Sequence, residues 1–177
     1  PQCGWIQASD WEAVGQVAAD CFGLWFFNSC AAAGASQPHR HLQILPRPAG
    51  SASCPLAPLL RAQLQPSDGP RPSAAWPWSY ALQRRQSADD PDELAALYRQ
   101  QSQLLGLGTP EADPQPRHPY NILFDDEWFL MVRRRREHCA GFSLNALGFA
   151  GYLLATEESD LAWLESHRAW QPSANAS

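Results

Sequence analysis

The segment from Tyr120 to Arg133 constrains the fold more than any other part of this sequence. It consists of two apolar runs, YNILF and EWFLMVR, which meet at the short acidic turn DDE. Short apolar runs bounded by turn residues are typical of buried strands, and so short a connection lets the two strands run only antiparallel. The sequence therefore predicts an antiparallel hairpin at this place.

Other segments carry the spacing of helices and strands around this hairpin. In residues 8–22, Trp11 and Val14 begin a helical apolar pattern behind a Ser/Asp cap. Residues 90–108 form the clearest helix, with Pro91 in the first turn and glycines at the end. Further strands are predicted at 24–28, 38–46 and 78–84, a further helix at 158–170, and a Pro-rich loop at 46–77. The expected fold class is α+β, a mainly antiparallel sheet with helices packed on it.

The composition argues against several classes of protein. A chain of 177 residues, 45% of them hydrophobic, can hold one core of ordinary size or two small ones. The formal net charge of −5 argues against a nucleic-acid partner, and no apolar run is long enough to cross a membrane. Five cysteines without a C-x-x-C pair favour a reduced compartment, so we expect a cytoplasmic protein.

Two histidines and a glutamine alternate in one of the predicted strands. Side chains two residues apart share one face of a strand, so His39, His41 and Gln43 are expected to project together. Leu42 and Ile44 point to the other face and suit a core. The histidine face is therefore expected to line a cleft.

Three interpretations of the two histidines compete. Both can be ordinary core or surface residues. Both can ligate a metal ion, but then His118, His138 or a distant carboxylate has to supply a third ligand. The third interpretation is nucleophilic catalysis at phosphorus, in which an imidazole takes up a phosphoryl group and releases it again. The loop of small residues at 31–37 favours it, because its backbone N–H groups can approach phosphate oxygens.

Two separated blocks of the sequence resemble one enzyme family. The first, NSCAAAGASQPHRHLQ, resembles the motif of the ATP adenylyltransferases, also called diadenosine tetraphosphate phosphorylases, which belong to the histidine triad superfamily. The second comprises PYNILFDDEWFLMVRRRRE and SLNALGFAGYLLA, which resemble the C-terminal region of the same family. The blocks occur in the family's order, and the resemblance covers residues 10–165.

The resemblance implies roles for individual residues. His41 matches the nucleophile that carries the adenylyl group, His39 its supporting neighbour, and Gln43 the residue that contacts phosphate in place of the triad's last histidine. An uncharged glutamine can donate to a phosphate oxygen without titrating near neutral pH. The ligand-binding positions that the family implies are Asn28, Gly34, Ala35, Ser36 and Gln37.

The second block adds binding candidates, and both blocks depart from the family pattern. Asn145 either touches substrate or caps a turn. The run from Arg133 to Arg136 either forms a solvated strand end or brings some of its arginines to the polyphosphate. Arg133 stands where the family usually has proline, and Cys30 where it has glycine, so we expect the Cys30 side chain to crowd the loop or to change its backbone angles. The arginines of this run that are binding candidates are Arg134, Arg135 and Arg136.

The implied reaction is phosphorolysis of a dinucleoside tetraphosphate by inorganic phosphate, which gives ADP and ATP, or the reverse reaction. The implied partners are dinucleoside polyphosphate, ATP, ADP and phosphate, with no nucleic acid and no membrane. No cofactor and no protein metal site follow from the sequence, although a divalent cation such as Mg²⁺ can assist by screening the polyphosphate. The alternatives are a related dinucleoside polyphosphate hydrolase and a catalytically silent nucleotide-binding fragment.

The resemblance also implies how the chain is organised. Residues 1–80 match the C-terminal part of a histidine-triad-like catalytic domain, and residues 81–177 match the family's C-terminal region, packed on the same sheet. Family members carry a further segment before the equivalent of residue 1, so the sheet is expected to be incomplete on that side. We then expect some of the aromatic residues Trp25, Phe26 and Phe27 to be partly uncovered and this chain to be poorly soluble or oligomeric, with little activity alone.

Overall fold

The computed structural model describes residues 1–64, 76–87 and 90–166. Within these residues the centre is a five-stranded sheet in the order β2-β1-β4-β5-β3, and every neighbouring pair is antiparallel. The predicted α+β class with a mainly antiparallel sheet is confirmed. The strands are β1 (Gly23–Asn28), β2 (Gln43–Pro46), β3 (Tyr80–Arg84), β4 (Tyr120–Phe124) and β5 (Trp128–Arg133).

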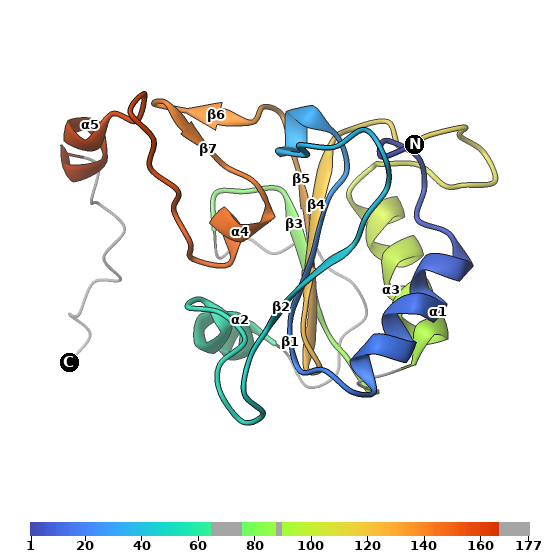
Figure 1. Ribbon diagram of the computed structural model, residues 1–177. Coiled ribbons are helices and arrows are strands. Elements are labelled where there is room, and N and C mark those ends of the chain that lie inside the picture. The colour runs from blue at the N-terminus through green and yellow to red at the C-terminus, as the bar shows by residue number, and fades with distance from the viewer. Residues whose placement is uncertain (65–75, 88–89, 167–177) are drawn as a thin grey trace.

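Helices cover both faces of this sheet. Those described are α1 (Ala8–Ala18), α2 (Ala57–Gln63), α3 (Pro91–Leu104), α4 (Ala146–Phe149), α5 (Leu161–Ser166) and the 3-10 helix η1 (Ala31–Ala33). α1 and α3 lie on one face, whereas α2 and α4 lie on the other (Figure 1). A small hairpin of β6 (His138–Cys139) and β7 (Phe142–Ser143) precedes α4. In the described part of the chain, no helix has both the length and the apolar character needed to span a bilayer.

The hairpin of β4 and β5 forms as the sequence predicts. The register pairs Phe124 with Phe129 next to the turn. All of β4 is buried, and so is all of β5 except its final residue. Oδ1 of Asp125 accepts the N–H groups of Glu127 at 2.8 Å and Trp128 at 3.1 Å. Burial raises the pKa of this carboxyl, although both donors act in the opposite direction. The acidic turn is therefore held by its own first carboxylate.

The two faces of β1 contribute to two separate apolar clusters. Trp25 and Phe27 point to the side of α1 and α3, whereas Leu24 and Phe26 point to the side of α2 and α4. Trp25 is 7% exposed, Phe26 8% and Phe27 0%. The expectation that these aromatic side chains are partly uncovered is wrong, because the described chain covers both faces of β1.

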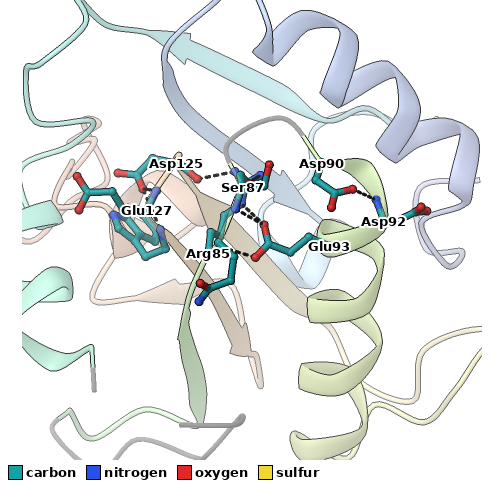
Figure 2. Close-up of polar contacts among 9 residues, drawn as sticks. Arg85, Ser87, Asp90, Asp92, Glu93, Asp125 and Glu127 are labelled. Atoms are coloured by element: carbon teal, nitrogen blue, oxygen red, sulfur yellow. Dashed lines mark hydrogen bonds and ion pairs between the residues drawn. The ribbon is translucent and has the colours of Figure 1, made fainter. Parts of the chain in front are cut away.

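Polar contacts fasten the start of α3 to one end of the sheet (Figure 2). The buried Arg85 guanidinium donates to the Asp125 carbonyl at 2.6 Å and lies 3.7 Å from the Glu93 carboxylate. In the first turn of the helix, the Asp90 side chain accepts the N–H of Asp92 at 2.9 Å. A carboxylate at this position satisfies a free backbone donor and suits the helix dipole. α3 is thereby fixed against β3 and β5.

The predicted histidine strand is shorter in the structure. β2 begins only at Gln43, and His39 and His41 lie in the irregular segment before it. The ladder stops there because another side chain is inserted between this segment and β1. The predicted placement of Leu42 and Ile44 on a core face is nevertheless confirmed, since both pack against the cluster on the side of α1 and α3.

The Pro-rich stretch that was expected to be a loop contains α2. Pro58 stands in the first turn of this helix, where proline is compatible with helical backbone. Ala57 and Leu60 are fully buried against the sheet. The expectation of a stretch without a packed element is therefore wrong here, while residues 65–75 lie outside the described residues.

Besides α3, which ends at Leu104 and not at residue 108, two other predicted helices are shorter in the structure. α1 ends at Ala18 and not at residue 22. α5 confirms a helix within the segment predicted at 158–170, of which residues 167–170 lie outside the described residues. Neither difference affects the sheet, since the buried positions of α1 lie before its end.

Candidate active site

Polar side chains gather at one end of the sheet, where β1 and β5 finish and β2 and β4 begin. This is the upper end in Figure 1, beside the N-terminus. The strands that meet here come from distant parts of the sequence. The register places Asn28, the last residue of β1, opposite Asn121 of β4.

The ring of His41 is oriented by its own chain. Its Nδ1 lies 2.9 Å from the carbonyl oxygen of His39. Because a carbonyl oxygen only accepts, Nδ1 carries the proton in the neutral ring, and Nε2 carries the lone pair. The two imidazole centroids are 5.4 Å apart. The structure thus brings the two predicted histidines together and gives His41 a nucleophilic nitrogen.

Asn28 joins β1 to the C-terminal part of the chain. Its Oδ1 accepts from the side-chain amide of Asn121 at 2.7 Å and from the N–H of Ala146 at 2.8 Å. Its backbone carbonyl accepts from the side-chain amide of Gln2. Asn28 is 5% exposed and Asn121 0%, so these bonds form in a sheltered environment where they are strong. Asn28 is therefore a structural junction, and its contact with substrate stays a prediction.

Arg134 completes this network from the side of β5. Its guanidinium donates to Oδ1 of Asn121 and to the Arg136 carbonyl, each at 2.7 Å, and also to the Leu144 carbonyl. The guanidinium carbon lies 4.8 Å from the centroid of the Phe149 ring. Burial lowers the pKa of Arg134 from its ordinary value. Since the guanidinium already serves the protein's own acceptors, its contact with a polyphosphate stays a prediction.

The loop after β1 packs against the start of α4. Gly34 has a φ of +86°, and a Cβ on it would lie 2.5 Å from the Cβ of Asn145. Asn145 is the N-cap of α4, where its side chain accepts the N–H of Leu147 at 2.9 Å. The structure brings two predicted binding residues into contact and shows that Asn145 does cap a helix.

Gly34→Ala is expected to lower the free energy of unfolding by about 3 kcal/mol. A left-handed backbone costs an L-residue about 1–2 kcal/mol, and overlap in a packed site costs about 1–3 kcal/mol more. Gly50→Ala is the matched control, because Gly50 has a φ of +80° with nothing within 4 Å of its added Cβ. Urea unfolding should give about 1 kcal/mol for that control. Equal losses in the two variants would show that Asn145 does not press on the loop.

Cys30 adopts an ordinary extended backbone conformation at the start of this loop. Its φ of −165° and ψ of 178° are extended and open to any residue. Its carbonyl accepts the N–H groups of Ala33 at 2.9 Å and Ala35 at 3.0 Å, which closes the loop. That the Cys30 side chain crowds the loop or changes its angles relative to glycine stays a prediction. All five cysteines of the chain are free thiols.

The remaining positions of the first block lie in this loop or after it. Ala35 is half-buried, whereas Ser36 and Gln37 are exposed. Gln43 pairs with Phe26 across β1 and β2, so its half-buried side chain lies on the face of α2 and α4. Asn28 lies on this same face, two residues after Phe26, and the glutamine therefore belongs to the polar end of the sheet.

Arg135 and Arg136 line a cavity of about 530 Å³ that adjoins this end of the sheet. Its walls also include Trp78, His138 and Phe149. Both arginines are exposed, and neither guanidinium has a hydrogen-bond or ion-pair partner among the described residues. They therefore supply unpaired positive charge beside the network of Asn28.

The metal interpretation of the histidines gains no third ligand from the structure. Within residues 1–64, 76–87 and 90–166, no three side chains of the metal-ligating kinds gather. His118 lines a separate cavity with Cys3 and Cys30, and His138 belongs to β6.

Two residues of this site escaped the sequence analysis. Asn121 donates to the carbonyl of Ala33 at 2.8 Å as well as to Asn28, and so holds η1 to β4. Its signal in the sequence is one amide inside the apolar run YNILF. Gln2 lies in an irregular start of the chain, where no local pattern marks it.

Two family models match the chain. The ATP adenylyltransferase C-terminal domain matches residues 74–172, and the Ap4A phosphorylase N-terminal domain matches residues 1–62. The residues that match the C-terminal domain contain β3, β4 and β5, and those that match the N-terminal domain contain β1 and β2 of the same sheet. No curated protein matches the chain.

Crystal structures of the yeast Ap4A phosphorylase Apa2 have a similar fold. One has a TM-score of 0.64 at 25% identity and covers 93% of this chain and 58% of that chain. The complex with Ap4A has a TM-score of 0.66 at 22% identity, and the complex with AMP 0.64 at 21%. The match to each complex covers 93% of this chain and 60% of the Apa2 chain.

Proposed function

Because this chain belongs to the ATP adenylyltransferase family, we propose that it transfers an adenylyl group through His41. The proposed substrate is diadenosine tetraphosphate, the acceptor is inorganic phosphate, and the products are ATP and ADP. One contact carries the mechanism: Nδ1 of His41 at 2.9 Å from the His39 carbonyl, which leaves the lone pair on Nε2. The complexes of Apa2 with Ap4A and AMP support the choice of an adenine nucleotide.

In the first step, Nε2 of His41 attacks the α-phosphorus of one adenosine. A phosphorus–nitrogen bond forms, the bond from this phosphorus to the bridging oxygen breaks, and its electron pair leaves with ATP. The backbone N–H groups of Ser36 and Gln37 and the side-chain amide of Gln43 stabilise the charge on the phosphate oxygens, whereas the N–H groups of Gly34 and Ala35 already donate to the carbonyls of Ala31 and Cys30. The His39 carbonyl holds the ring while positive charge builds up on it.

In the second step, an oxygen of inorganic phosphate attacks the same phosphorus. The phosphorus–nitrogen bond breaks, its electron pair returns to Nε2, and ADP leaves. Because each step only exchanges one ligand of phosphorus for another, the two steps can also run in reverse. This two-step course replaces one difficult transfer by two easier ones.

The unpaired arginines complete the proposal for substrate binding. Arg135 and Arg136 neutralise the distal phosphates at the cavity that adjoins the site. Arg134, Asn28 and Asn145 act mainly by shaping this end of the sheet, since their polar groups already have partners in the protein. We retain residues 1–80 as the part that provides the nucleophile and residues 81–177 as the part packed against it.

The experiment that tests this function follows labelled adenylate. The chain is mixed with diadenosine tetraphosphate labelled at the α-phosphate, first without inorganic phosphate and then with it. We expect acid-labile label on the protein and one equivalent of ATP in the first case, and ADP in the second. AMP formed without phosphate would indicate a hydrolase. No covalent label with intact nucleotide binding would indicate a silent binding module.

Gln43→Glu is expected to reduce the transfer rate about 10²-fold more than Gln43→Asn. The glutamate sets a negative charge against phosphate oxygens in a half-buried position, whereas asparagine keeps the amide donor. Single-turnover rates at pH 7 measure the difference. Equal rates for the two variants would refute the role of Gln43 as a donor to phosphate.

A further inference from the structure

The side chain of Gln2 lies between β1 and the segment that carries His41. It is 2% exposed. Its Oε1 accepts the backbone N–H of His41 at 3.1 Å, and its Nε2 donates to the backbone carbonyl of Asn28. One side-chain amide thus joins the residue of the nucleophile to the last residue of β1.

This amide occupies a place in the ladder between β1 and β2. The N–H of Arg47 donates to the carbonyl of Phe22 at 2.9 Å, which marks a hydrogen-bonded pair of the antiparallel ladder. Such pairs recur at every second residue, so the same register sets the His41 N–H opposite the Asn28 carbonyl. Each of these two groups bonds the amide of Gln2 instead of the other.

A glutamine suits this place because its amide carries an acceptor and a donor in one plane, as a peptide group does. An inserted amide with two hydrogen bonds takes more room than one direct bond. The histidine segment is therefore set away from β1, which agrees with the start of β2 at Gln43.

Gln2 also fixes the beginning of the same segment. Its backbone N–H donates to the carbonyl of Pro38 at 3.0 Å. From the opposite face, Nε of Arg40 lies 2.7 Å from Oδ2 of Asp10 in α1. Residues 38–41 are thus held by Gln2 at both ends and by Asp10 through Arg40. These contacts set the distance between Nδ1 of His41 and the His39 carbonyl.

We propose that Gln2 is a positioning residue for adenylyl transfer. It fixes the backbone of His41 and thereby the contact of Nδ1 with the His39 carbonyl, which keeps the lone pair on Nε2 and aims it at phosphorus. This inference rests on the proposed role of His41 as nucleophile. Gln2 itself touches neither the substrate nor the reacting atoms.

The test uses the whole chain with three substitutions. Gln2→Leu removes both side-chain hydrogen bonds at nearly constant volume, and Gln2→Glu keeps the acceptor but loses the donor at neutral pH. Gln101→Leu is the matched control, because Gln101 is fully buried and its Nε2 donates to the Phe129 carbonyl at 3.2 Å, in the helix layer. If Gln2→Leu fails to fold, Gln2→Glu carries the test.

Two readouts separate positioning from general support of the fold. We expect the single-turnover rate of adenylate transfer to fall about 10²-fold in Gln2→Leu, with the Kd for nucleotide within about threefold of wild type. Gln101→Leu should lose stability and keep the rate. Nitrogen NMR of the His41 ring should show mainly the Nδ1–H tautomer in the wild type and a mixture of tautomers in Gln2→Leu.

Each outcome bears on one proposal only. An unchanged tautomer ratio in Gln2→Leu overturns the positioning role, and so does an unchanged transfer rate when the wild type is active. A wild-type chain that takes up no adenylate refutes the proposed function instead. The tautomer ratio then still decides whether Gln2 orients the ring.

Discussion

His41→Asn is expected to leave nucleotide binding intact and to abolish the uptake of adenylate. Asparagine is polar and smaller than histidine, but its amide nitrogen has no lone pair that can attack phosphorus. The covalent route is therefore lost, and the rate of ATP release should fall by a factor on the order of 10⁴. Rapid mixing with labelled diadenosine tetraphosphate measures both the bound label and the released ATP.

His118→Asn is the control for this experiment, because His118 lies in the segment before β4 and no hydrogen bond or ion pair among the described residues joins it to His39, His41 or Gln43. We expect it to retain the wild-type rate. Turnover of His41→Asn within about tenfold of wild type would exclude His41 as the covalent nucleophile, since no comparable route remains.

Arg134→Met is expected to destabilise the fold by about 3 kcal/mol. Methionine keeps much of the length of the side chain, but the acceptors on Asn121, Leu144 and Arg136 lose their buried donor. Each unsatisfied buried acceptor costs about 1–3 kcal/mol, part of which relaxation and water recover. Urea denaturation followed by tryptophan fluorescence gives the change in the free energy of unfolding.

Arg135→Met provides a matched control in the next position of the chain. Arg135 is exposed and its guanidinium has no partner within the described residues, so its replacement should change stability by less than about 0.5 kcal/mol. It should instead weaken the binding of the polyphosphate. Similar losses of stability in the two variants would show that Arg134 is no more than a surface charge.

The parts of the fold that the sequence predicts correctly are those set by local pattern. β4 and β5 follow from two apolar runs and one acidic turn, and α3 follows from Pro91 and a helical apolar spacing. α2 was missed because prolines around it suggest a loop, although Pro58 stands at a position that helices tolerate. Burial of Leu60 against the sheet then decides in favour of the helix.

The features of the candidate site that the sequence predicts are again the local ones. The proximity of His39 to His41 and the loop of small residues at 31–37 are properties of one short segment, and the sequence predicts both. The residues that hold this segment in place are distant from it in the sequence, so the spacing of residues within the segment cannot indicate them. Asn121 and Gln2 reach it only through the register of the sheet and the path of the N-terminal residues.

The pairing of β1 with β4 also has a consequence for how the protein folds. Asn28 and Asn121, which bond each other across these strands, are 93 residues apart in the sequence. Closing so long a segment costs chain entropy before any contact offsets it, whereas the hairpin of β4 and β5 closes across a short turn. Helices and this hairpin should therefore form early, and the candidate active site late. Recovery of activity during refolding then reports the closure of the sheet, which recovery of helical signal does not.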